Sequence, residues 1–579
     1  MPHRTHLFSL RIGHAVRESC ITEPYSGRRF GKDLIAGLTV GVIAIPLAMA
    51  LAIASGVAPQ YGLYTAAIAG FFIALTGGSR FSISGPTAAF VVILYPITQK
   101  YGLGGLLLAS VMAGIILIAM ALFRVGRFIE YIPEPVTLGF TSGIGVVIAT
   151  MQIKDFLGLS VESMPEHYWD KLILLARLIP DTHWPSLLVA AITFAIMLLW
   201  PLLRAPVPAH LPALFAGSMV ALWLNNTGLG VETIASRFQY TTAGGSVGHG
   251  IPPMLPVFQW PWTQPGGDGE SLTLGWGVVR DLLPAAFAIA MLGAIESLLC
   301  AVIMDGMTGK RHSANSELLG QGIGNLIAPF FGGITATAAI ARSTANYKAG
   351  AESPVAAMVH ALVILLGLVG LTTLLGYLPM PVMAALLLVV AWNMSEAPKS
   401  LHLLKTSQPG DRWIFLTCFA LTVMVDMVIA ITAGILLAAI LFMKTIADMT
   451  RLIDISGNNQ YLSKPLPENW RVFKVTGPLF FAAADKIFSE LTRYCTAGRG
   501  VILYLDNATV LDAGGVAALT KLISHCEHAN AQLILTDIQF QPLKTLAKAQ
   551  VKPITGVFNL YPCLRDALNI IDPHNESNR

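Results

Sequence analysis

Two similar stretches of sequence decide the fold: residues 77–89 read GGSRFSISGPTAA, and residues 332–339 read GGITATAA. Each stretch begins with two glycines, lacks a helical pattern, and leads into an apolar segment shorter than the roughly 20 residues that cross a bilayer. We expect each short segment to be a half-helix that directly follows an extended stretch. Paired interruptions in corresponding places are typical of transporters built from two repeats, with the binding site near the midplane. The pair therefore predicts a duplicated membrane domain.

The composition indicates a protein that crosses the membrane many times. Of the 579 residues, 54% are hydrophobic and only 12% are charged, whereas an ordinary soluble domain has about 25% charged residues. This excludes a disordered chain, a fibrous repeat and an ordinary soluble enzyme. The net charge of +4 is too small to indicate nucleic-acid binding. Six scattered cysteines without a C-x-x-C pair predict neither a disulfide framework nor a metal site.

Long apolar runs predict fourteen spans, arranged as two halves of seven. The expected spans are 34–55, 60–78, 86–99, 102–123, 134–156, 184–203, 210–228, 282–304, 315–333, 338–350, 355–376, 380–397, 412–430 and 431–446. Each broken segment is the third span of its half, and an odd number of spans per half forces the second half to be inverted. Lysines and arginines in the short loops place the N- and C-termini in the cytoplasm.

Changes in composition and hydrophobic pattern divide the chain into four parts. Residues 1–33 form a polar cytoplasmic segment, and residues 34–446 form the membrane domain. Residues 447–468, with several Gly, Asn and Pro, are expected to be a linker. Residues 469–573 alternate short β-rich runs with amphipathic stretches, which predicts a cytoplasmic α/β domain.

The two broken segments predict an anion-binding site. A helix start presents free N–H groups and a partial positive charge, which attract anions. Two such starts facing each other near the bilayer centre would form one positively polarised pocket. The alternative is that the Gly-Thr-Ala runs only allow close helix packing. We expect that simpler role for Gly37-x-x-x-Gly41 and Gly139-x-x-x-Gly143.

Two ionisable residues inside predicted spans are candidates for function, because a charge at membrane depth is costly. Glu296 lies in the middle of the eighth span and could bind and release a proton during transport. Arg342 lies in the first turns of the short tenth span, where its planar fork could hold a substrate carboxylate. The alternatives are a permanent Glu296–Arg342 pair, or an arginine that reaches the membrane interface.

Several motifs and family features identify the chain as similar to a known family. Residues 57–64 (VAPQYGLY), 82–87 (SISGPT), 131–136 (YIPEPV) and 341–343 (ARS) resemble the signature regions of the sulfate permease (SulP) anion transporters. Residues 477–482 (GPLFFA) resemble the first strand of the STAS domain that such transporters carry. Among family members, the bacterial aerobic C4-dicarboxylate transporters are the most similar in detail.

The resemblance implies a fold and a site. It implies a core domain of spans 1–4 and 8–11, a gate domain of spans 5–7 and 12–14, and a homodimer. It places the substrate between the ends of spans 3 and 10, facing spans 1 and 8. Carried over by motif, the substrate-binding residues are Pro86, Thr87, Ala88, Ala339, Ala341 and Arg342, with Leu47 and Leu51 as the wall from span 1. Glu296 matches the acidic position of span 8.

Two departures from related sequences shape the expectations. Sodium-coupled bicarbonate members have an Asp and a nearby Thr on span 8, where this chain has Glu296 and Cys300, so a proton is the expected coupling ion. STAS relatives that are phosphorylated carry a hydroxyl in a D-S-S-G turn. This chain has Asp512-Ala513-Gly514-Gly515, so we do not expect a phosphorylation switch at this turn. The expected roles of the STAS domain are dimer contact or docking of a cytoplasmic protein.

Together these features predict a secondary transporter in the bacterial inner membrane that imports C4-dicarboxylates such as succinate, fumarate or aspartate with protons. The alternatives are a bicarbonate or sulfate transporter, coupled to sodium or protons, or a membrane-anchored STAS signalling scaffold. The sequence contains no P-loop motif and no nucleophile–base constellation, so we expect neither an ATP-driven pump nor an enzyme, and no cofactor.

Overall fold

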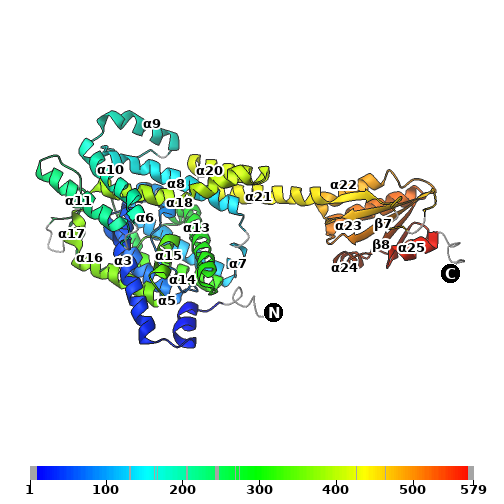
Figure 1. The fold of residues 1–579 in the computed structure, drawn as a ribbon, viewed down its shortest axis with the longest axis horizontal. Coiled ribbons are helices and arrows are strands. Elements are labelled where there is room, and N and C mark those ends of the chain that lie inside the picture. Colours follow the sequence, from blue (N-terminus) through cyan, green and yellow to red (C-terminus); the bar gives the residue numbers. More distant parts are fainter. Residues whose placement is uncertain are drawn as a thin grey trace. The chain divides into compact units, whose positions relative to one another are not determined.

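The computed structural model describes residues 10–129, 132–161, 164–165, 167–203, 207–241, 247–267, 269–272, 274–425, 427–458, 460–462 and 465–571. The chain forms two compact units, a helical unit (Met1–Ile435) and a sheet unit (Leu436–Arg579). Figure 1 shows the membrane helices in the first unit and the strands with their covering helices in the second. Seven helices in the described ranges are long and apolar enough to cross a bilayer.

The helices follow the fourteen predicted spans, and each half has the same order of elements. The first half contains α3 (Gly27–Ala54), α4 (Pro59–Tyr64) continued by the π-helix η2 (Thr65–Ala69) and α5 (Gly70–Thr76), β1 (Ser84–Gly85), α6 (Ala88–Leu122), α8 (Glu134–Leu157), α10 (Trp184–Leu199) and α11 (His210–Asn226). The second half contains α13 (Trp276–Thr308), α14 (Ala314–Ile327), β4 (Thr337–Ala338), α15 (Ile340–Lys348), α16 (Val355–Gly370), α18 (Met380–Met394), α20 (Pro409–Met424) and α21 (Met427–Met449).

Shorter elements connect the spans. They are α2 (His14–Val16), η1 (Arg17–Thr22), α7 (Gly126–Ile129), α9 (Tyr168–Leu178), η3 (Ile179–Asp181), η4 (Trp200–Leu203), α12 (Ile234–Arg237), β2 (Gln239–Thr241), β3 (Val247–His249), η5 (Pro261–Thr263), η6 (Ala328–Phe331), α17 (Thr372–Gly376) and α19 (Ala397–Thr406). Strands β2 and β3 form an antiparallel hairpin in the connection between the two halves.

Predicted spans 3 and 4 share the element α6, which breaks at Gly102. This residue has φ 64° and ψ −167°, outside the helical region. A Cβ there would lie 2.4 Å from the carbonyl group of Gly266, so both the backbone angle and the close approach require glycine.

The packing of the helices reflects the inverted repeat. The eighth span (α13) packs on α6 of the first half, and the first span (α3) packs on α16 of the second half. Helices α3–α6 and α13–α16 pack mainly on one another, and helices α8, α10, α11, α18 and α20 form a second group. The two groups correspond to the core and gate domains that the resemblance implies.

The glycine pairs expected to allow close helix packing have that role. Cβ atoms on Gly37 and Gly41 would approach Val359 and Val363 of α16 within 2.8 Å. Cβ atoms added to Gly139 and Gly143 would approach α20 in the same way, 2.6 Å from Cys418 Cβ and 2.7 Å from Thr422 Cβ respectively.

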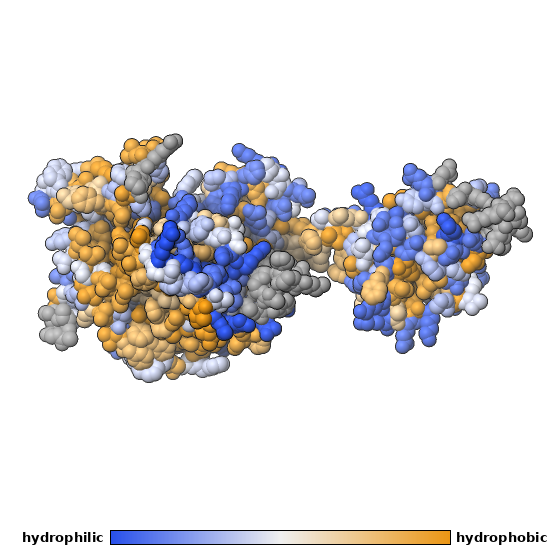
Figure 2. Space-filling model, turned by 60° about the horizontal axis from the view of Figure 1, so that its bottom comes forward, coloured by the Kyte–Doolittle hydropathy of each residue, from blue (hydrophilic) through white to orange (hydrophobic). Residues whose placement is uncertain are grey.

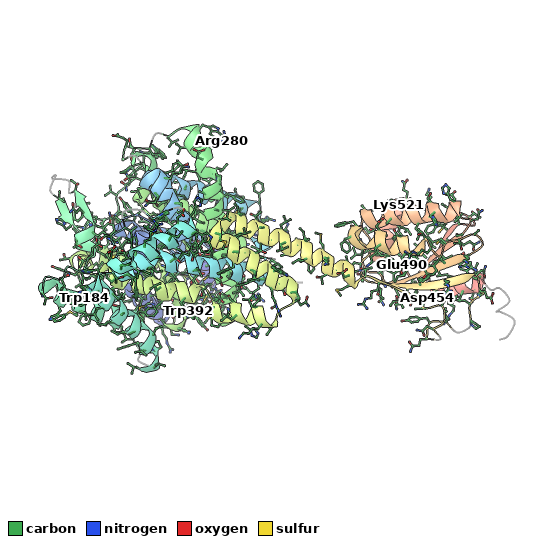
Figure 3. All side chains as sticks on the ribbon, turned by 90° about the horizontal axis from the view of Figure 1, so that it is seen from above. Trp184, Arg280, Trp392, Asp454, Glu490 and Lys521 are labelled. Carbon is green, nitrogen blue, oxygen red and sulfur yellow. The ribbon has the colours of Figure 1, made fainter. Side chains whose placement is uncertain are left out.

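Apolar side chains cover much of the visible face of the helical unit (Figure 2). Many large apolar residues of α3, α10, α11 and α21 are exposed, as expected for helices that face lipid. Trp184 and Trp392, labelled on this unit in Figure 3, are also exposed, consistent with aromatic residues at a membrane interface.

The sheet unit contains a five-stranded sheet in the order β5-β6-β7-β8-β9. Its strands are β5 (Arg451–Asp454), β6 (Trp470–Thr476), β7 (Gly500–Asn507), β8 (Gln532–Thr536) and β9 (Phe558–Tyr561), all parallel except β5. Its helices are α22 (Phe481–Leu491), α23 (Ala513–His528), α24 (Phe540–Lys548) and α25 (Leu564–Ile571). Side chains of α22, α23 and α24 share one apolar cluster with the sheet, and α25 packs in a second cluster.

Candidate functional site

The two broken segments meet as a short antiparallel pair. Ser84 of β1 lies opposite Ala338 of β4, and Gly85 lies opposite Thr337. The Ala339 N–H also donates to the Ile83 carbonyl at 3.0 Å. Strand β1 leads into the part of α6 before its break at Gly102, and β4 leads into α15. The pairing of the strands therefore brings the starts of these two short helical segments together.

The starts of both short helices leave backbone donors available. Thr87 and Ala339 are the N-cap residues of α6 and α15, both with extended backbone angles. Neither makes a side-chain cap bond within the described residues. The first N–H groups of a helix have no partner within the helix, so these two starts can bind an anion.

Arg342 crosses from the second repeat to the first. Its Nη2 donates to the Pro86 carbonyl at 2.6 Å, and the residue is 5% exposed. Its Nε and Nη1 have no hydrogen-bond partner among the described residues. A Cβ on Gly85 would lie 2.8 Å from Nη1, so only glycine lets the guanidinium sit this close to β1. The reading of Arg342 as an arginine that reaches the interface is therefore wrong.

Glu296 on α13 faces the start of α6. The Thr87 hydroxyl donates to Glu296 Oε2 at 3.1 Å. In the described part of the chain, Glu296 and Arg342 do not form an ion pair, and the two charges interact only at longer range. The permanent pair considered above is not formed, and both side chains lie beside the same helix start.

One turn beyond Glu296, Cys300 connects α13 to α15. Its Sγ donates to the Ser343 hydroxyl at 3.3 Å. That hydroxyl accepts from the Ile83 N–H at 2.9 Å and donates to the Ala339 carbonyl at 2.8 Å. A thiol at this position therefore supports the backbone of both broken segments.

The remaining predicted residues lie around this centre. Ala88 is the first residue of α6 and is buried, whereas Ala341 in the first turn of α15 is exposed. Leu51 on α3 is buried in the same apolar cluster as Ala88, and the partly buried Leu47 packs against that cluster. The structure thus joins Pro86, Thr87, Glu296, Ala339 and Arg342 through hydrogen bonds to neighbouring segments, and the leucines only through the shared core.

Three buried polar residues of α14 support the broken segments, and none of them was among the site residues expected from the sequence. They are Glu317, Gln321 and Asn325. Their spacing of four residues places them on one face of the helix, a signal that the sequence does contain.

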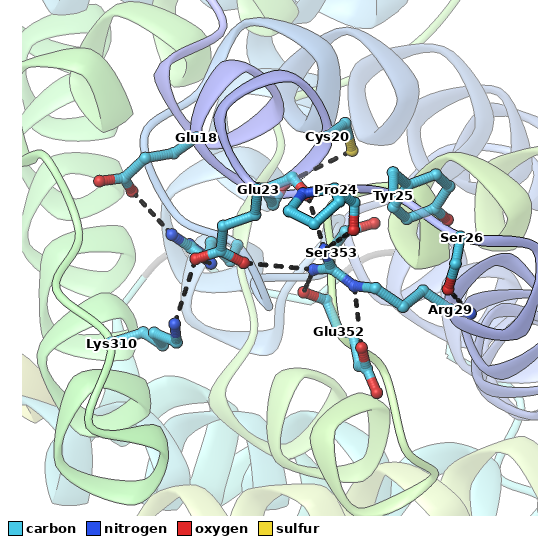
Figure 4. A network of polar contacts seen from close by, with 12 residues as sticks. Glu18, Cys20, Glu23, Pro24, Tyr25, Ser26, Arg29, Lys310, Glu352 and Ser353 are labelled. Atoms are coloured by element: carbon cyan, nitrogen blue, oxygen red, sulfur yellow. Dashed lines mark hydrogen bonds and ion pairs between the residues drawn. The ribbon is translucent and has the colours of Figure 1, made fainter.

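A polar network anchors the loops at the N-terminal side of the site (Figure 4). Glu23 accepts from Arg80 at 2.8 Å and from Lys310 at 3.1 Å. Arg29 donates to Glu352 at 2.9 Å. The hydrogen bond from Lys32 is the largest cause that holds the pKa of Glu352 below its usual range; burial opposes it, and the charge of Lys32 and the bond from Arg29 add to the lowering.

The network joins the two halves of the chain. Arg80 lies four residues before β1, and Glu352 follows α15. Asp33 at the start of α3 accepts from the backbone N–H groups of Glu352 and Ser353 at 2.7 and 3.1 Å. The segments that flank the site are therefore held at the end of the core group where the chain begins.

A cavity of about 520 Å³ lies along the helices that carry the site. Val92 of α6 and Ala288 of α13 line it from the core group, and Val147 of α8 and Thr422 of α20 line it from the other group. Ala288 lies eight residues before Glu296 on α13, a distance of about 12 Å along the axis. The cavity lies where the two helix groups face each other.

Comparison with known proteins gives the family. The model of the Sulfate permease family matches residues 30–420, and the STAS domain model matches residues 461–567. A "Putative sulfate transporter YvdB" of Bacillus subtilis is 39% identical over 536 residues, covering 92% of this chain and 95% of that protein. The "Bicarbonate transporter BicA" of Synechocystis is 29% identical over 583 residues, covering 96% and 97%.

Two solved structures share the fold. The transmembrane domain of a cyanobacterial bicarbonate transporter BicA aligns with a TM-score of 0.59 and 27% identity, covering 72% of this chain and 98% of that one. Murine Slc26a9 aligns with a TM-score of 0.81 and 17% identity, covering 97% and 94%. The matching family and these relatives are transporters, so the chain is a multi-pass anion transporter rather than an enzyme. The chain belongs to the sulfate permease family and carries a C-terminal STAS domain.

Proposed function

We propose that the chain imports a small oxyanion by alternating access, with a proton carried on Glu296. The observation that carries this proposal is the buried, incompletely paired guanidinium of Arg342 beside two helix starts. A guanidinium fork binds a carboxylate or sulfate through two parallel hydrogen bonds. Pro86, Thr87, Ala88, Ala339 and Ala341 would surround the anion, and Leu47 and Leu51 would close the side toward α3.

Glu296 supports proton coupling through its position. It lies next to Thr87 at the same helix start, so substrate and proton would travel on one group of helices. A dianion entering a cell that is negative inside costs about 2.3 kcal/mol per charge for each 100 mV. Two or more co-transported protons would offset that cost.

The first candidate substrate is a C4-dicarboxylate. The small side chains of Ala88, Ala339 and Ala341 leave room for more than a monatomic ion. The second candidate is sulfate or bicarbonate, which is favoured by the names of two similar relatives, a putative sulfate transporter and a bicarbonate transporter. Cys300, one turn from Glu296, offers a sulfur where a sodium site needs oxygen, so the proton remains the proposed coupling ion.

The remaining parts of the proposal concern location and assembly. We infer a bacterial inner-membrane protein with both termini in the cytoplasm, acting as a homodimer, whose STAS domain contacts its partner subunit or a cytoplasmic protein. Asp512 caps α23 through Gly515 N–H at 2.7 Å, so it has a structural role in the turn where phosphorylated relatives carry a hydroxyl. A signalling scaffold would lose its activity when residues 464–579 are deleted, whereas a transporter would keep anion binding.

The test is uptake into proteoliposomes of labelled succinate, fumarate, aspartate, sulfate and bicarbonate, at an external pH of about 5 and about 7.5. We expect acid-stimulated uptake of one of these oxyanions, and Glu296→Gln should remove the dependence on pH. Glu396→Gln, which changes a surface carboxylate paired with Lys399, is the matched control and should keep it. Normal acid stimulation in Glu296→Gln would show that the proton is carried elsewhere.

A further inference from the structure

One face of α14 carries a buried row of polar side chains. Glu317, Gln321 and Asn325 follow one another at intervals of four residues, and each is at most 1% exposed. A buried polar group is costly in a membrane unless it is hydrogen-bonded. The bonds that these three residues make therefore show what the row holds in place.

Gln321 holds the first broken segment. Its Nε2 donates to the Ser84 hydroxyl of β1 at 3.1 Å and to Glu317 Oε1 at 3.0 Å. The other carboxylate oxygen of Glu317 accepts from the N–H groups of Gly78 and Ser79 at 3.0 and 2.9 Å. The loop that leads to β1 is thus fixed to α14 at both of its ends.

Asn325 holds the second broken segment. Its Oδ1 accepts from the Ala336 N–H at 2.7 Å, and its Nδ2 donates to the Ala336 carbonyl at 2.8 Å. The side-chain amide therefore pairs with Ala336 as a neighbouring strand would. Because Gln321 lies one turn away, a single helix fixes both strands about 6 Å apart along its axis.

In the part of the chain that the structure describes, the equivalent helix of the first repeat does not carry a matching row. In α4, η2 and α5 the corresponding contacts are one bond from the Ile334 N–H to the Thr65 hydroxyl at 2.7 Å, and a close approach of Gly70 to the Ser84 carbonyl. Among the described residues, polar side chains of α14 thus bond to both broken segments, whereas Thr65 and Ser110 of the first repeat bond only to the segment before β4. This asymmetry is not visible in the matched glycine-rich stretches.

We propose that Gln321 and Asn325 are positioning residues that set the spacing of the two helix starts, and that this spacing determines how tightly the anion is held. Gln321 acts on β1 and the start of α6, whereas Asn325 acts on β4 and the start of α15. The consequence for the anion rests on the function proposed above. The effect on the strands does not.

The first experiment measures amide hydrogen exchange of the full chain in lipid nanodiscs without substrate. Gln321→Met should speed exchange in residues 82–90 by roughly tenfold and change residues 334–342 less, because one buried hydrogen bond is lost at β1. Asn325→Leu should do the reverse. Thr98→Val removes a hydroxyl whose one bond within the described ranges is to the Leu94 carbonyl of its own helix, and should change neither segment.

Asn325→Ala provides a second test if the leucine variant does not fold. The alanine removes both bonds to Ala336 without adding a bulky apolar side chain, so exchange should again rise in residues 334–342 more than in residues 82–90. Equal changes in both segments with either variant, or no change in either, would overturn the assignment.

The second experiment measures succinate uptake, with sulfate in a parallel series. Both positioning variants should raise KM roughly tenfold while changing the maximal rate less, because the helix starts are displaced but still present. A lower maximal rate at unchanged KM would contradict a role in anion binding. If the unmodified chain carries neither succinate nor sulfate, these two anions are not its substrates, while the exchange pattern still decides whether α14 positions the strands.

Discussion

Substituting Gly85 tests the geometry of the site with one added methyl group. In Gly85→Ala the new Cβ would lie 2.8 Å from Arg342 Nη1, and Ala66 at 3.5 Å blocks its retreat on the other side. Ordinary contact begins at 3.4 Å, so the guanidinium must withdraw by about 3.4 − 2.8 = 0.6 Å. The Nη2 bond to the Pro86 carbonyl would then lengthen from 2.6 Å toward the far end of the normal range.

Weakening a buried hydrogen bond from a charged donor costs about 1–2 kcal/mol, which corresponds to roughly tenfold in affinity. The anion is proposed to bind the same guanidinium. Its withdrawal should weaken one of the anion's hydrogen bonds by a similar amount and raise the KM for uptake roughly tenfold. The chain should still fold, because no fold-wide packing is lost. Gly306→Ala, where a Cβ meets no atom within 4 Å, is the matched control.

The assay is initial-rate uptake into proteoliposomes, with thermal unfolding in detergent measured on the same preparations. An unchanged KM in Gly85→Ala, at normal thermal stability, would refute the placement of Arg342 as the anion's partner. A KM increase that Gly306→Ala shares would refute it equally, because it would reflect a general effect of alanine.

Three further changes test other parts of the chain. Gly102→Ala combines a positive φ with a Cβ 2.4 Å from the Gly266 carbonyl, and should reduce the monodisperse fraction in size-exclusion chromatography severely. Asp512→Ala removes the cap of α23 and should cost about 1 kcal/mol, seen as faster amide exchange in its first turn. Glu352→Gln should lower thermal stability at neutral pH; because the pKa of Glu352 is lowered in the fold, the difference from the unmodified chain should close as pH falls below about 4.

The meeting of the two broken segments could be predicted because its signal is local. Residues 77–89 and 332–339 each combine a glycine pair, an extended stretch and a short apolar run, and each becomes a two-residue strand followed by a helix. Inversion of the second half followed from the span count. Both features depend only on neighbouring residues and on the thickness of the bilayer.

The partners of individual side chains could not be predicted in the same way. Opposite charge suggested that Glu296 pairs with Arg342, but Thr87 and the Pro86 carbonyl take these roles. Gln321 bonds to Ser84, which is 237 positions away in sequence. Such contacts depend on helix rotation and register in three dimensions, which a periodic pattern does not specify.

The antiparallel joint between β1 and β4 limits how the protein can move. Two residues from each half pair as strands, so the start of α6 cannot tilt without moving the start of α15. A movement that carried the anion across the membrane would therefore displace the starts of α6 and α15 together, as one rigid unit. The flexible positions must therefore lie elsewhere, in the connections between this paired unit and the helices around it.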